Sequence, residues 1–237
     1  NVRELDGIAA TRDGLRIGAA TRLADLEHSP HLVGAWRVLA DGAARVGSPQ
    51  IRNLATLGGN VCNASPAADT IPPLLVLDAA AEILSLRGQR SVPLSEFFVG
   101  PGRTVLEPDE FLAGLLISRP FDGAAAVYLK HSPRQAMDLS VVGVAVLLAP
   151  SADGAPGRWM GRIALGAVAP TPLRARAAEE LLSSTGVNDD NLWAEVARQA
   201  ATSVSPIDDI RASAEYRREM VAGLTERALR LVASQLA

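Results

Sequence analysis

The sequence of 237 residues contains a single cysteine, Cys62. One thiol cannot form a disulfide within the chain, and it cannot supply the several thiolates that an iron–sulfur cluster or a structural zinc site requires. Such sparing use of cysteine is typical of a reducing compartment, so we expect a cytoplasmic protein. With 48% hydrophobic residues, the chain can instead bury a substantial core, as one large domain or two small ones.

The sequence also lacks an excess of positive charge and a long apolar run. The 23 Lys and Arg residues are outnumbered by 26 Asp and Glu, which gives a formal net charge of −3. The basic residues are scattered along the chain, which argues against a nucleic-acid-binding protein. No apolar stretch approaches the roughly 20 residues that cross a bilayer, so we expect no insertion into a membrane.

The common nucleotide and catalytic motifs are missing as well. The sequence has no GxGxxG pattern and no Walker Lys-Thr, which leaves neither a Rossmann fold nor a P-loop supported. Its histidines, His28, His31 and His131, have no catalytic spacing to a serine, cysteine or carboxylate. We therefore expect no residue that acts as a nucleophile, and we assign no metal site.

The first half of the chain predicts a mixture of short strands and short helices. Strands are expected in "LRIG", "AEILSL" and "EFLAGLLIS". Helices are expected in "HLVGAWRVLADGAARVGS", where apolar residues recur at helical spacing, and in "TIPPLLVL", which begins with prolines. Thr21 is expected to cap a further short helix. This mixture indicates an α+β unit.

The second half repeats the α+β character in another order. The segments "AAAVYLKHS", "DLSVVGVAVLLA" and "RWMGRIALGAVAP" predict three antiparallel strands, and three helices follow them. Strands followed by helices indicate a separate unit, so we divide the chain into domains 1–120 and 121–237. Asp208 and Asp209 precede the last helix and are expected to pair with Arg217 or Arg218.

The stretch "NLATLGGNVCNASPAAD", from Asn53 to Asp69, contains two adjacent glycines. A glycine pair near asparagine and proline is most often a surface turn. It can also form a loop whose backbone N–H groups converge on a phosphate, with hydrogen bonds added by Thr56, Asn60 and Ser65. The residues alone leave both interpretations open. Asp69 is expected to cap the helix that follows it.

The longer segment "QIRNLATLGGNVCNASPAADTIPPLLVLDA" resembles the second flavin-binding motif of the FAD-binding medium subunit in the molybdenum hydroxylase family, which includes xanthine dehydrogenase and carbon monoxide dehydrogenase. The resemblance continues through "GPGRTVLEPDEFLAGLLI", "YLKHSPRQAMDLSVVGVAV", "RIALGAVAPTPLRARAAEELL" and "DDIRASAEYRREMV". It implies that residues 1–120 are the second lobe of a FAD domain of the vanillyl-alcohol-oxidase type. It further implies a C-terminal domain with a three-stranded antiparallel sheet and a three-helix bundle.

The resemblance also implies a FAD site. The diphosphate and its neighbouring sugar would lie at residues 56–60, with an acidic contact behind them and further contacts to the adenine or flavin rings. The implied cofactor-binding residues are Thr56, Leu57, Gly58, Gly59, Asn60, Asp69, Val46, Leu112 and Lys130. Residues 134–138 would form a loop beside the isoalloxazine. Without the resemblance, Val46 and Leu112 would be expected in a core, and Lys130 would be expected on the surface.

The implied function is electron transfer within an oxidoreductase complex. In the family, a large molybdopterin subunit oxidises the substrate, a small subunit carries [2Fe–2S] clusters, and FAD passes the electrons to NAD, a quinone or dioxygen. Family members also carry an upstream first glycine-rich loop that this sequence does not show, so we expect the chain as given to be mostly free of FAD. The alternatives are a scaffold subunit without FAD and a binding domain for another phosphorylated ligand.

Overall fold

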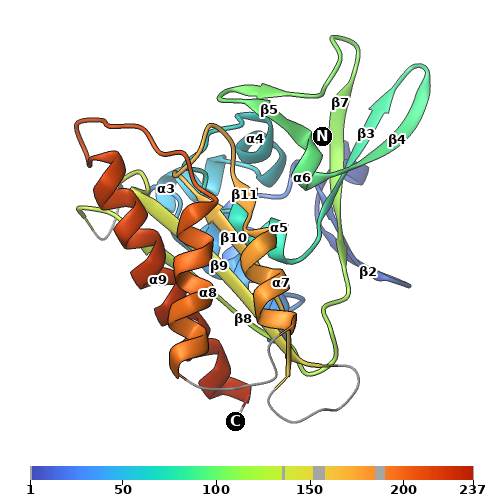
Figure 1. Cartoon of the computed structure of the whole chain (residues 1–237). Coiled ribbons are helices and arrows are strands. Elements are labelled where there is room, and N and C mark those ends of the chain that lie inside the picture. The colour runs from blue at the N-terminus through green and yellow to red at the C-terminus, as the bar shows by residue number, and fades with distance from the viewer. Residues whose placement is uncertain (1, 135–136, 152–157, 185–189, 237) are drawn as a thin grey trace.

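The computed structural model describes residues 2–134, 137–151, 158–184 and 190–236. Two antiparallel sheets, one of five strands and one of four, lie on either side of a group of short helices (Figure 1). A two-stranded ribbon of β5 (Phe98–Gly100) and β6 (Arg103–Thr104) completes the strand structure of the described residues. The fold is therefore a mixture of helices and antiparallel sheets, as the strand and helix patterns predict.

The five-stranded sheet is formed by the first half of the chain. Its strands, in spatial order, are β1 (Ile8–Thr11), β2 (Gly14–Gly18), β7 (Phe111–Ser118), β3 (Ala80–Ser85) and β4 (Gly88–Pro93). The predicted strands "LRIG", "AEILSL" and "EFLAGLLIS" are thus confirmed, and the last of them lies at the centre of the sheet. The strand β7, at the end of the first half, pairs with β2 on one side and with β3 on the other. It therefore links the first strands of the chain to the β3–β4 hairpin.

Short helices pack between the two sheets. They are α1 (Leu23–Glu27), α2 (Arg37–Ala44), α3 (Pro49–Leu54), α4 (Leu57–Cys62), α5 (Ile71–Val76) and α6 (Leu94–Phe97), with 3-10 turns at Arg3–Leu5 and Gly34–Trp36. The helices predicted from the apolar spacing and from the prolines correspond to α2 and α5. The prediction for Thr21 is wrong: Arg22 precedes α1, and the Thr21 hydroxyl exchanges hydrogen bonds with the backbone of Gly7.

The second sheet contains one strand more than predicted. Its order is β11 (Leu173–Arg174), β10 (Trp159–Gly166), β9 (Val142–Pro150) and β8 (Ala125–His131). The long strands β8, β9 and β10 match the predicted ones. The additional strand β11 forms because the chain after β10 folds back and pairs Leu173 with Leu165 along the open edge of β10. The helix predicted to begin near Pro172 therefore begins at Arg176.

The second sheet is covered on both faces. The helices α7 (Arg176–Ser184), α8 (Asp190–Thr202) and α9 (Ala214–Leu236) lie over one face (Figure 1), and α5 and α2 pack against the other. Along β9, Val144 and Val146 face the core under α7–α9, whereas Ala145 and Leu147 belong to the core of the first half. This two-sided burial explains why β9 is a continuous apolar run and not an alternating one.

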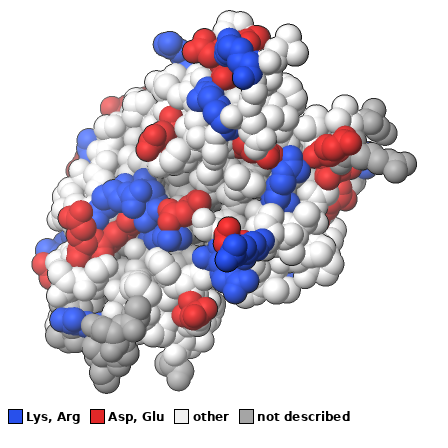
Figure 2. Space-filling view, turned by 90° about the vertical axis from the view of Figure 1, so that its right-hand side faces the viewer, with Lys and Arg blue, Asp and Glu red and all other residues white. Residues whose placement is uncertain are grey.

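Charged side chains on the outside are mixed in sign. On the face shown in Figure 2, acidic and basic residues of the described chain lie side by side in small groups. Among the ion pairs of the hairpin formed by β3 and β4 are Arg87 with Asp109 and Arg90 with Glu110. Within the described residues, none of the helices combines the length and the apolar character that crossing a bilayer requires.

Candidate functional site

The glycine-rich stretch forms a helix and not the predicted loop. Thr56 is the N-cap of α4, and its hydroxyl accepts a hydrogen bond from the Gly59 N–H at 3.1 Å. The Asn60 N–H then donates to the Thr56 carbonyl at 3.0 Å, which closes the first helical turn. A threonine that caps the helix thus compensates for the poor helix propensity of the two glycines.

The two glycines have different surroundings. A side-chain Cβ at Gly58 would lie 2.5 Å from the Ala19 Cβ and 2.7 Å from the Ala19 carbonyl oxygen, so Gly58 allows α4 to pack against the chain that follows β2. A Cβ at Gly59 would meet only the Thr56 hydroxyl, at 3.1 Å, among the atoms around it. Gly58 is therefore needed for packing, whereas Gly59 lies at the surface with open space beside it.

The first N–H groups of α4 already have acceptors within the chain. The Leu57 N–H donates to the Thr21 carbonyl at 2.9 Å, and the Gly58 N–H donates to the Ala19 carbonyl at 2.8 Å. These bonds hold α4 against the segment between β2 and α1. A phosphate at this helix start would have to compete with Thr56 for the Gly59 N–H, or use side chains.

A cavity of about 250 Å³ lies beside α4 and brings together several of the residues that the resemblance implies. We call it the Asn60 cavity. Its lining residues are Val46, Gly47, Ile51, Asn60, Asn63, Ser65, Ala67, Ala68, Asp69, Met137, Asp138 and Leu139. They come from the turn after α2, from α3, from α4 itself, from the segment between α4 and α5, and from the loop after β8. The cavity thus joins the two halves of the chain.

Asp69 is the most buried polar residue of this cavity wall, with 6% of its surface exposed. Its carboxylate accepts hydrogen bonds from the Tyr128 hydroxyl at 2.7 Å and from the Ser140 hydroxyl at 2.6 Å. The Lys130 ammonium donates to its second oxygen at 2.8 Å. The predicted capping role is not what the structure shows, because Thr70 occupies the N-cap of α5 and the Asp69 carboxylate binds residues of β8 and Ser140.

Lys130 is a buried cation and not a surface charge. Its side chain is only 6% exposed, and its ammonium also donates to the carbonyl oxygens of Arg45 at 3.1 Å and Asp138 at 2.8 Å. An ammonium has three N–H donors, and these three acceptors use all of them. Lys130 therefore ties the end of α2, the start of α5 and the loop after β8 together around the Asn60 cavity.

The pKa values of two residues near Asp69, Tyr128 and Asp138, are shifted by their surroundings. Burial, followed by the charge of Asp69 and the hydrogen bond to it, raises the pKa of Tyr128 well above its usual value of 10.0. Tyr128 thus remains a hydrogen-bond donor to Asp69 at physiological pH. Burial acts to raise the pKa of Asp138, but the hydrogen bond and charge of Arg134 and backbone N–H groups outweigh it and lower that pKa.

Not every implied residue reaches the cavity. Leu112 lies on the central strand β7, where it is 6% exposed and packs in the core of the first half. Leu57 and Gly58 are buried beneath the surface of α4. Of the implied set, Val46, Asn60 and Asp69 line the Asn60 cavity, and Lys130 contacts its wall from behind.

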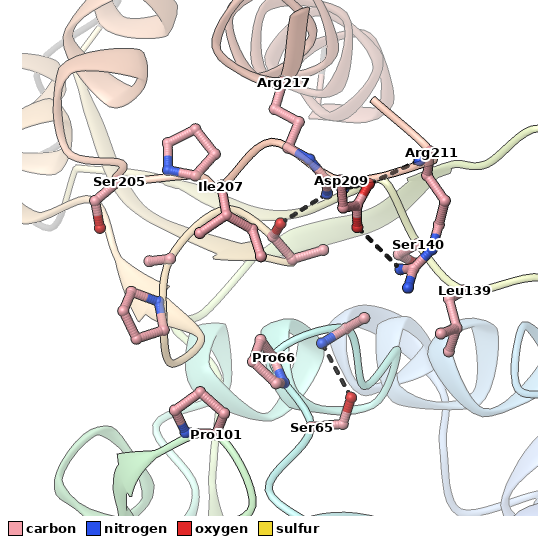
Figure 3. Close-up of a pocket in the computed structure, with 15 residues that line it drawn as sticks. Ser65, Pro66, Pro101, Leu139, Ser140, Ser205, Ile207, Asp209, Arg211 and Arg217 are labelled. Carbon is pink, nitrogen blue, oxygen red and sulfur yellow. Dashed lines mark hydrogen bonds and ion pairs between the residues drawn. The ribbon is translucent and has the colours of Figure 1, made fainter. Parts of the chain in front are cut away.

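A second cavity of about 310 Å³ lies next to the first and shares Ser65, Ala67 and Leu139 with it. We call it the Arg217 cavity (Figure 3). Its lining residues are Ser65, Pro66, Ala67, Pro101, Leu139, Ser140, Ala167, Ala169, Pro170, Ser205, Pro206, Ile207, Asp209, Arg211 and Arg217. The segment between α8 and α9 supplies one wall, and the segment between α4 and α5 faces it across the opening (Figure 3).

Arg217 and Asp209 form the polar wall of this second cavity. The Arg217 side chain is 3% exposed, and its guanidinium contacts Asp209 at 2.8 Å and donates to the Val141 carbonyl at 2.7 Å. The predicted pairing of the acidic residues before the last helix with Arg217 is thus confirmed for Asp209. Asp208 accepts a hydrogen bond from the Ala214 N–H at the start of α9.

Tyr128 on β8 and Ser140, which precedes β9, also hold Asp69 but were not predicted from the sequence. Ser140 lies 71 positions from Asp69, and Tyr128 lies 59 positions away. One local signal was available for Tyr128, because Tyr128 and Lys130 are two positions apart on one strand and therefore share a face of the sheet. Nothing in the local pattern indicates Ser140.

Two family models match the chain. Residues 1–120 match the FAD binding domain in molybdopterin dehydrogenase, and residues 127–232 match the CO dehydrogenase flavoprotein C-terminal domain. The first match alone covers half of the chain, so the chain belongs to this family of FAD-binding proteins.

Individual relatives agree with the family models. The chain is 36% identical over 231 residues to a xanthine dehydrogenase FAD-binding subunit of Escherichia coli O157:H7. The aligned region covers 97% of this chain and 78% of that protein. It is 32% identical over 226 residues to the nicotinate dehydrogenase FAD-subunit of Eubacterium barkeri, covering 94% and 75% of the two chains.

The fold agrees as well. A solved structure of carbon monoxide dehydrogenase from Hydrogenophaga pseudoflava superimposes with a TM-score of 0.90 at 30% sequence identity, covering 100% of this chain and 80% of that chain. This chain is a FAD-binding subunit of the xanthine and carbon monoxide dehydrogenase type of molybdenum hydroxylase, an oxidoreductase family.

Proposed function

We propose that FAD binds along α4 and in the Asn60 cavity, and that this chain transfers electrons through it. The observation that carries the proposal is the assembly of Val46, Asn60 and Asp69 around one cavity from separate segments. Thr56, Gly59 and Asn60 at the start of α4 would lie beside the diphosphate. Residues 1–120 would form the second lobe of a FAD domain of the vanillyl-alcohol-oxidase type.

The chemistry of the cavity wall suits a flavin. Val46, Ile51 and Leu139 supply apolar surface, which an aromatic ring system requires. Asn60 and Asp69 supply an amide and a carboxylate, which can pair with the N–H and carbonyl groups of the ring. The Asn60 side-chain oxygen already accepts a hydrogen bond from the Thr70 hydroxyl at 2.6 Å, which orients the amide.

The proposed task of the chain is to hold and orient this group between two partners. Bound FAD would supply the redox chemistry, and the protein would supply binding, orientation and electrostatics. We propose that a small iron–sulfur subunit delivers the electrons, that a large molybdopterin subunit oxidises the substrate, and that the complex works in the cytoplasm. NAD, a quinone or dioxygen would accept the electrons. An electron acceptor bound in the Arg217 cavity would lie next to the Asn60 cavity, because Leu139 lines both cavities.

Substitution of Gly59 tests the site directly. A valine there would bring its Cβ to 3.1 Å from the Thr56 hydroxyl and would otherwise extend into the open space beside α4, where the diphosphate is proposed to approach. We expect Gly59→Val to reduce FAD binding by at least about tenfold, equivalent to about 1.4 kcal/mol, with little loss of stability. The full-length protein is co-expressed with the proposed partner subunits, and FAD is then titrated into the purified complex. Binding of FAD is followed by visible absorption.

Gly223→Val is the matched control. Gly223 also lies within a helix, α9, and a Cβ at this position would have no heavy atom of the surrounding structure within 4 Å. It is remote from the residues of the Asn60 cavity in the chain and lines neither cavity. We expect this variant to bind FAD like the wild type. A complex that is colourless after incubation with FAD and removal of the free cofactor would support a scaffold role. Equal FAD binding by Gly59→Val would rule out the proposed diphosphate site.

A further inference from the structure

We propose that Arg52 is a positioning residue for the Asn60 cavity. Together with Glu27, it holds the Val46 carbonyl and thereby fixes the Val46–Gly47 wall against which FAD binds. This inference rests on the proposed function, and it adds a residue that contacts the wall of the cavity from behind rather than lining it.

Arg52 lies on α3 and makes three contacts with its guanidinium. Its Nε donates to one oxygen of Glu27 at 2.7 Å, and a terminal nitrogen donates to the other oxygen at 3.3 Å. The remaining terminal nitrogen donates to the Val46 carbonyl at 3.2 Å. The Arg52 side chain is 11% exposed, so these contacts are made largely away from solvent.

The shape of arginine suits this arrangement. A planar guanidinium can bind both oxygens of a carboxylate and still present a donor to a third acceptor, which a lysine ammonium cannot do with the same geometry. Glu27 ends α1, and Val46 follows α2. One side chain therefore connects the ends of two helices to α3.

The wall that Arg52 holds is a sharp turn. Gly47 has a φ of +53°, and a Cβ there would lie 2.9 Å from the Ile51 side chain. Ser48 follows and caps α3 by accepting a hydrogen bond from the Ile51 N–H at 3.4 Å. Val46, Gly47 and Ile51 all line the Asn60 cavity, so a shift of this turn would change the shape of the cavity.

The chain contains a second arginine with similar partners, a glutamate and a backbone carbonyl, which serves as a control. Arg16 on β2 contacts one oxygen of Glu82 on β3: its Nε donates to that oxygen at 2.8 Å, and a terminal nitrogen forms an ion pair with the same oxygen at 2.6 Å. Another terminal nitrogen donates to the Glu4 carbonyl at 3.0 Å. Neither Arg16 nor Glu82 lines either cavity.

The first experiment compares Arg52→Met with Arg16→Met in the full chain. FAD affinity is measured by titration, and stability is measured by thermal unfolding without FAD. We expect both variants to lose stability, but only Arg52→Met to bind FAD at least about tenfold more weakly, which equals about 1.4 kcal/mol. If Arg52→Met does not fold, Arg52→Lys replaces it in the comparison, because lysine keeps a positive charge beside Glu27. We expect weaker FAD binding in Arg52→Lys too.

A charge swap separates the ion pair from the contact with the Val46 carbonyl. In the double variant Glu27→Arg and Arg52→Glu, the pair is restored, but a carboxylate at position 52 cannot donate to a carbonyl. We expect the swap to recover stability relative to Arg52→Glu alone while FAD binding stays weak. Recovery of FAD affinity with stability would overturn the inference, as would wild-type affinity in Arg52→Met. If the wild type itself binds no FAD, the proposed function fails first.

Discussion

Among single residues, Asp69 carries a carboxylate that is nearly buried, with a side chain 7% exposed. Burying a carboxylate is costly unless hydrogen bonds and an opposite charge compensate for the lost water. Tyr128, Ser140 and Lys130 supply three donors, all within 2.8 Å. Asp69 is thus held in one orientation at the wall of the Asn60 cavity, so we expect its direction toward a ligand to be set before the ligand binds.

Substitution of Tyr128 by phenylalanine tests how much this environment contributes. The variant removes one hydrogen bond to a charged acceptor, and we expect the free energy of unfolding at neutral pH to fall by about 1.5–3 kcal/mol. Urea unfolding measures the change. Tyr216→Phe is the control, because Tyr216 is 41% exposed and its hydroxyl hydrogen-bonds only with the half-buried His131 ring in the described structure. A loss below about 0.5 kcal/mol is expected there.

The pH dependence of the Tyr128 variant follows from the direction of the pKa shift. The pKa of Tyr128 is raised in the folded protein, so its contribution is complete below about pH 10 and decreases as the pH rises above that value. The difference between wild type and Tyr128→Phe should therefore stay constant up to about pH 10 and shrink between about pH 10 and pH 11. A constant difference over that range would contradict the role given to the Tyr128 hydroxyl.

Among the elements, α5 is held at its C-terminal end by the second sheet. The last carbonyl groups of a helix lack partners within it and carry partial negative charge. Arg174 donates to the Leu75 carbonyl at 3.4 Å, and Arg162 donates to the Val76 carbonyl at 3.1 Å. Both arginines also pair with Asp78, which follows the helix with a φ of +48°. Side chains of β10 and β11 thus donate hydrogen bonds to the C-terminal carbonyl groups of a helix from the first half.

Loss of Arg174 should therefore weaken the contact between α5 and the second sheet. The Arg174 side chain is 6% exposed and also pairs with the nearly buried Glu179. We expect Arg174→Met to cost about 3–5 kcal/mol, because it leaves Glu179 buried without this partner. Arg176→Met removes a 61% exposed partner of the same Glu179 and should cost less than about 1 kcal/mol. The free energy of unfolding of both variants is measured by chemical denaturation. Equal losses in the two variants would contradict the expectation that the buried ion pair contributes more than the exposed one.

At the scale of the whole molecule, the core does not end at the boundary between the two proposed domains. The core cluster of the first half includes Tyr128, Ala145, Leu147 and Ala164 from the second sheet. In addition, the close approach of Gly166 to the Pro72 ring leaves no space for a side chain at that position. We infer that residues 1–120 and 121–237 fold as one cooperative unit.

Expression of residues 1–120 alone tests this inference. The fragment would expose the faces of α2 and α5 that β8, β9 and β10 cover, and we expect it to aggregate or to unfold without a cooperative thermal transition. Circular dichroism during heating measures this, with the full chain as the reference. A sharp, reversible transition in the isolated fragment would show that the first half is an independent domain.

The sequence by itself determined the features that depend on neighbouring residues. The apolar spacing located α2, β7 and β9, because the periods of helices and strands are local properties of the chain. The pairing of Asp209 with Arg217 was predictable for the same reason, since the two residues are only eight positions apart. Likewise, the family could be recognised, because its motifs are contiguous segments.

Only the tertiary structure decided which residues meet across long distances. Lys130 is a buried cation because β8 packs against α2 and Asp69 lies beside it, and no local pattern distinguishes it from a surface lysine. Gly58 and Gly59 are equivalent in the sequence, but only Gly58 lies against Ala19. The strand β11 likewise depends on the free edge of β10. In each case the outcome is set by the surfaces that pack together, and packing joins residues that the chain separates.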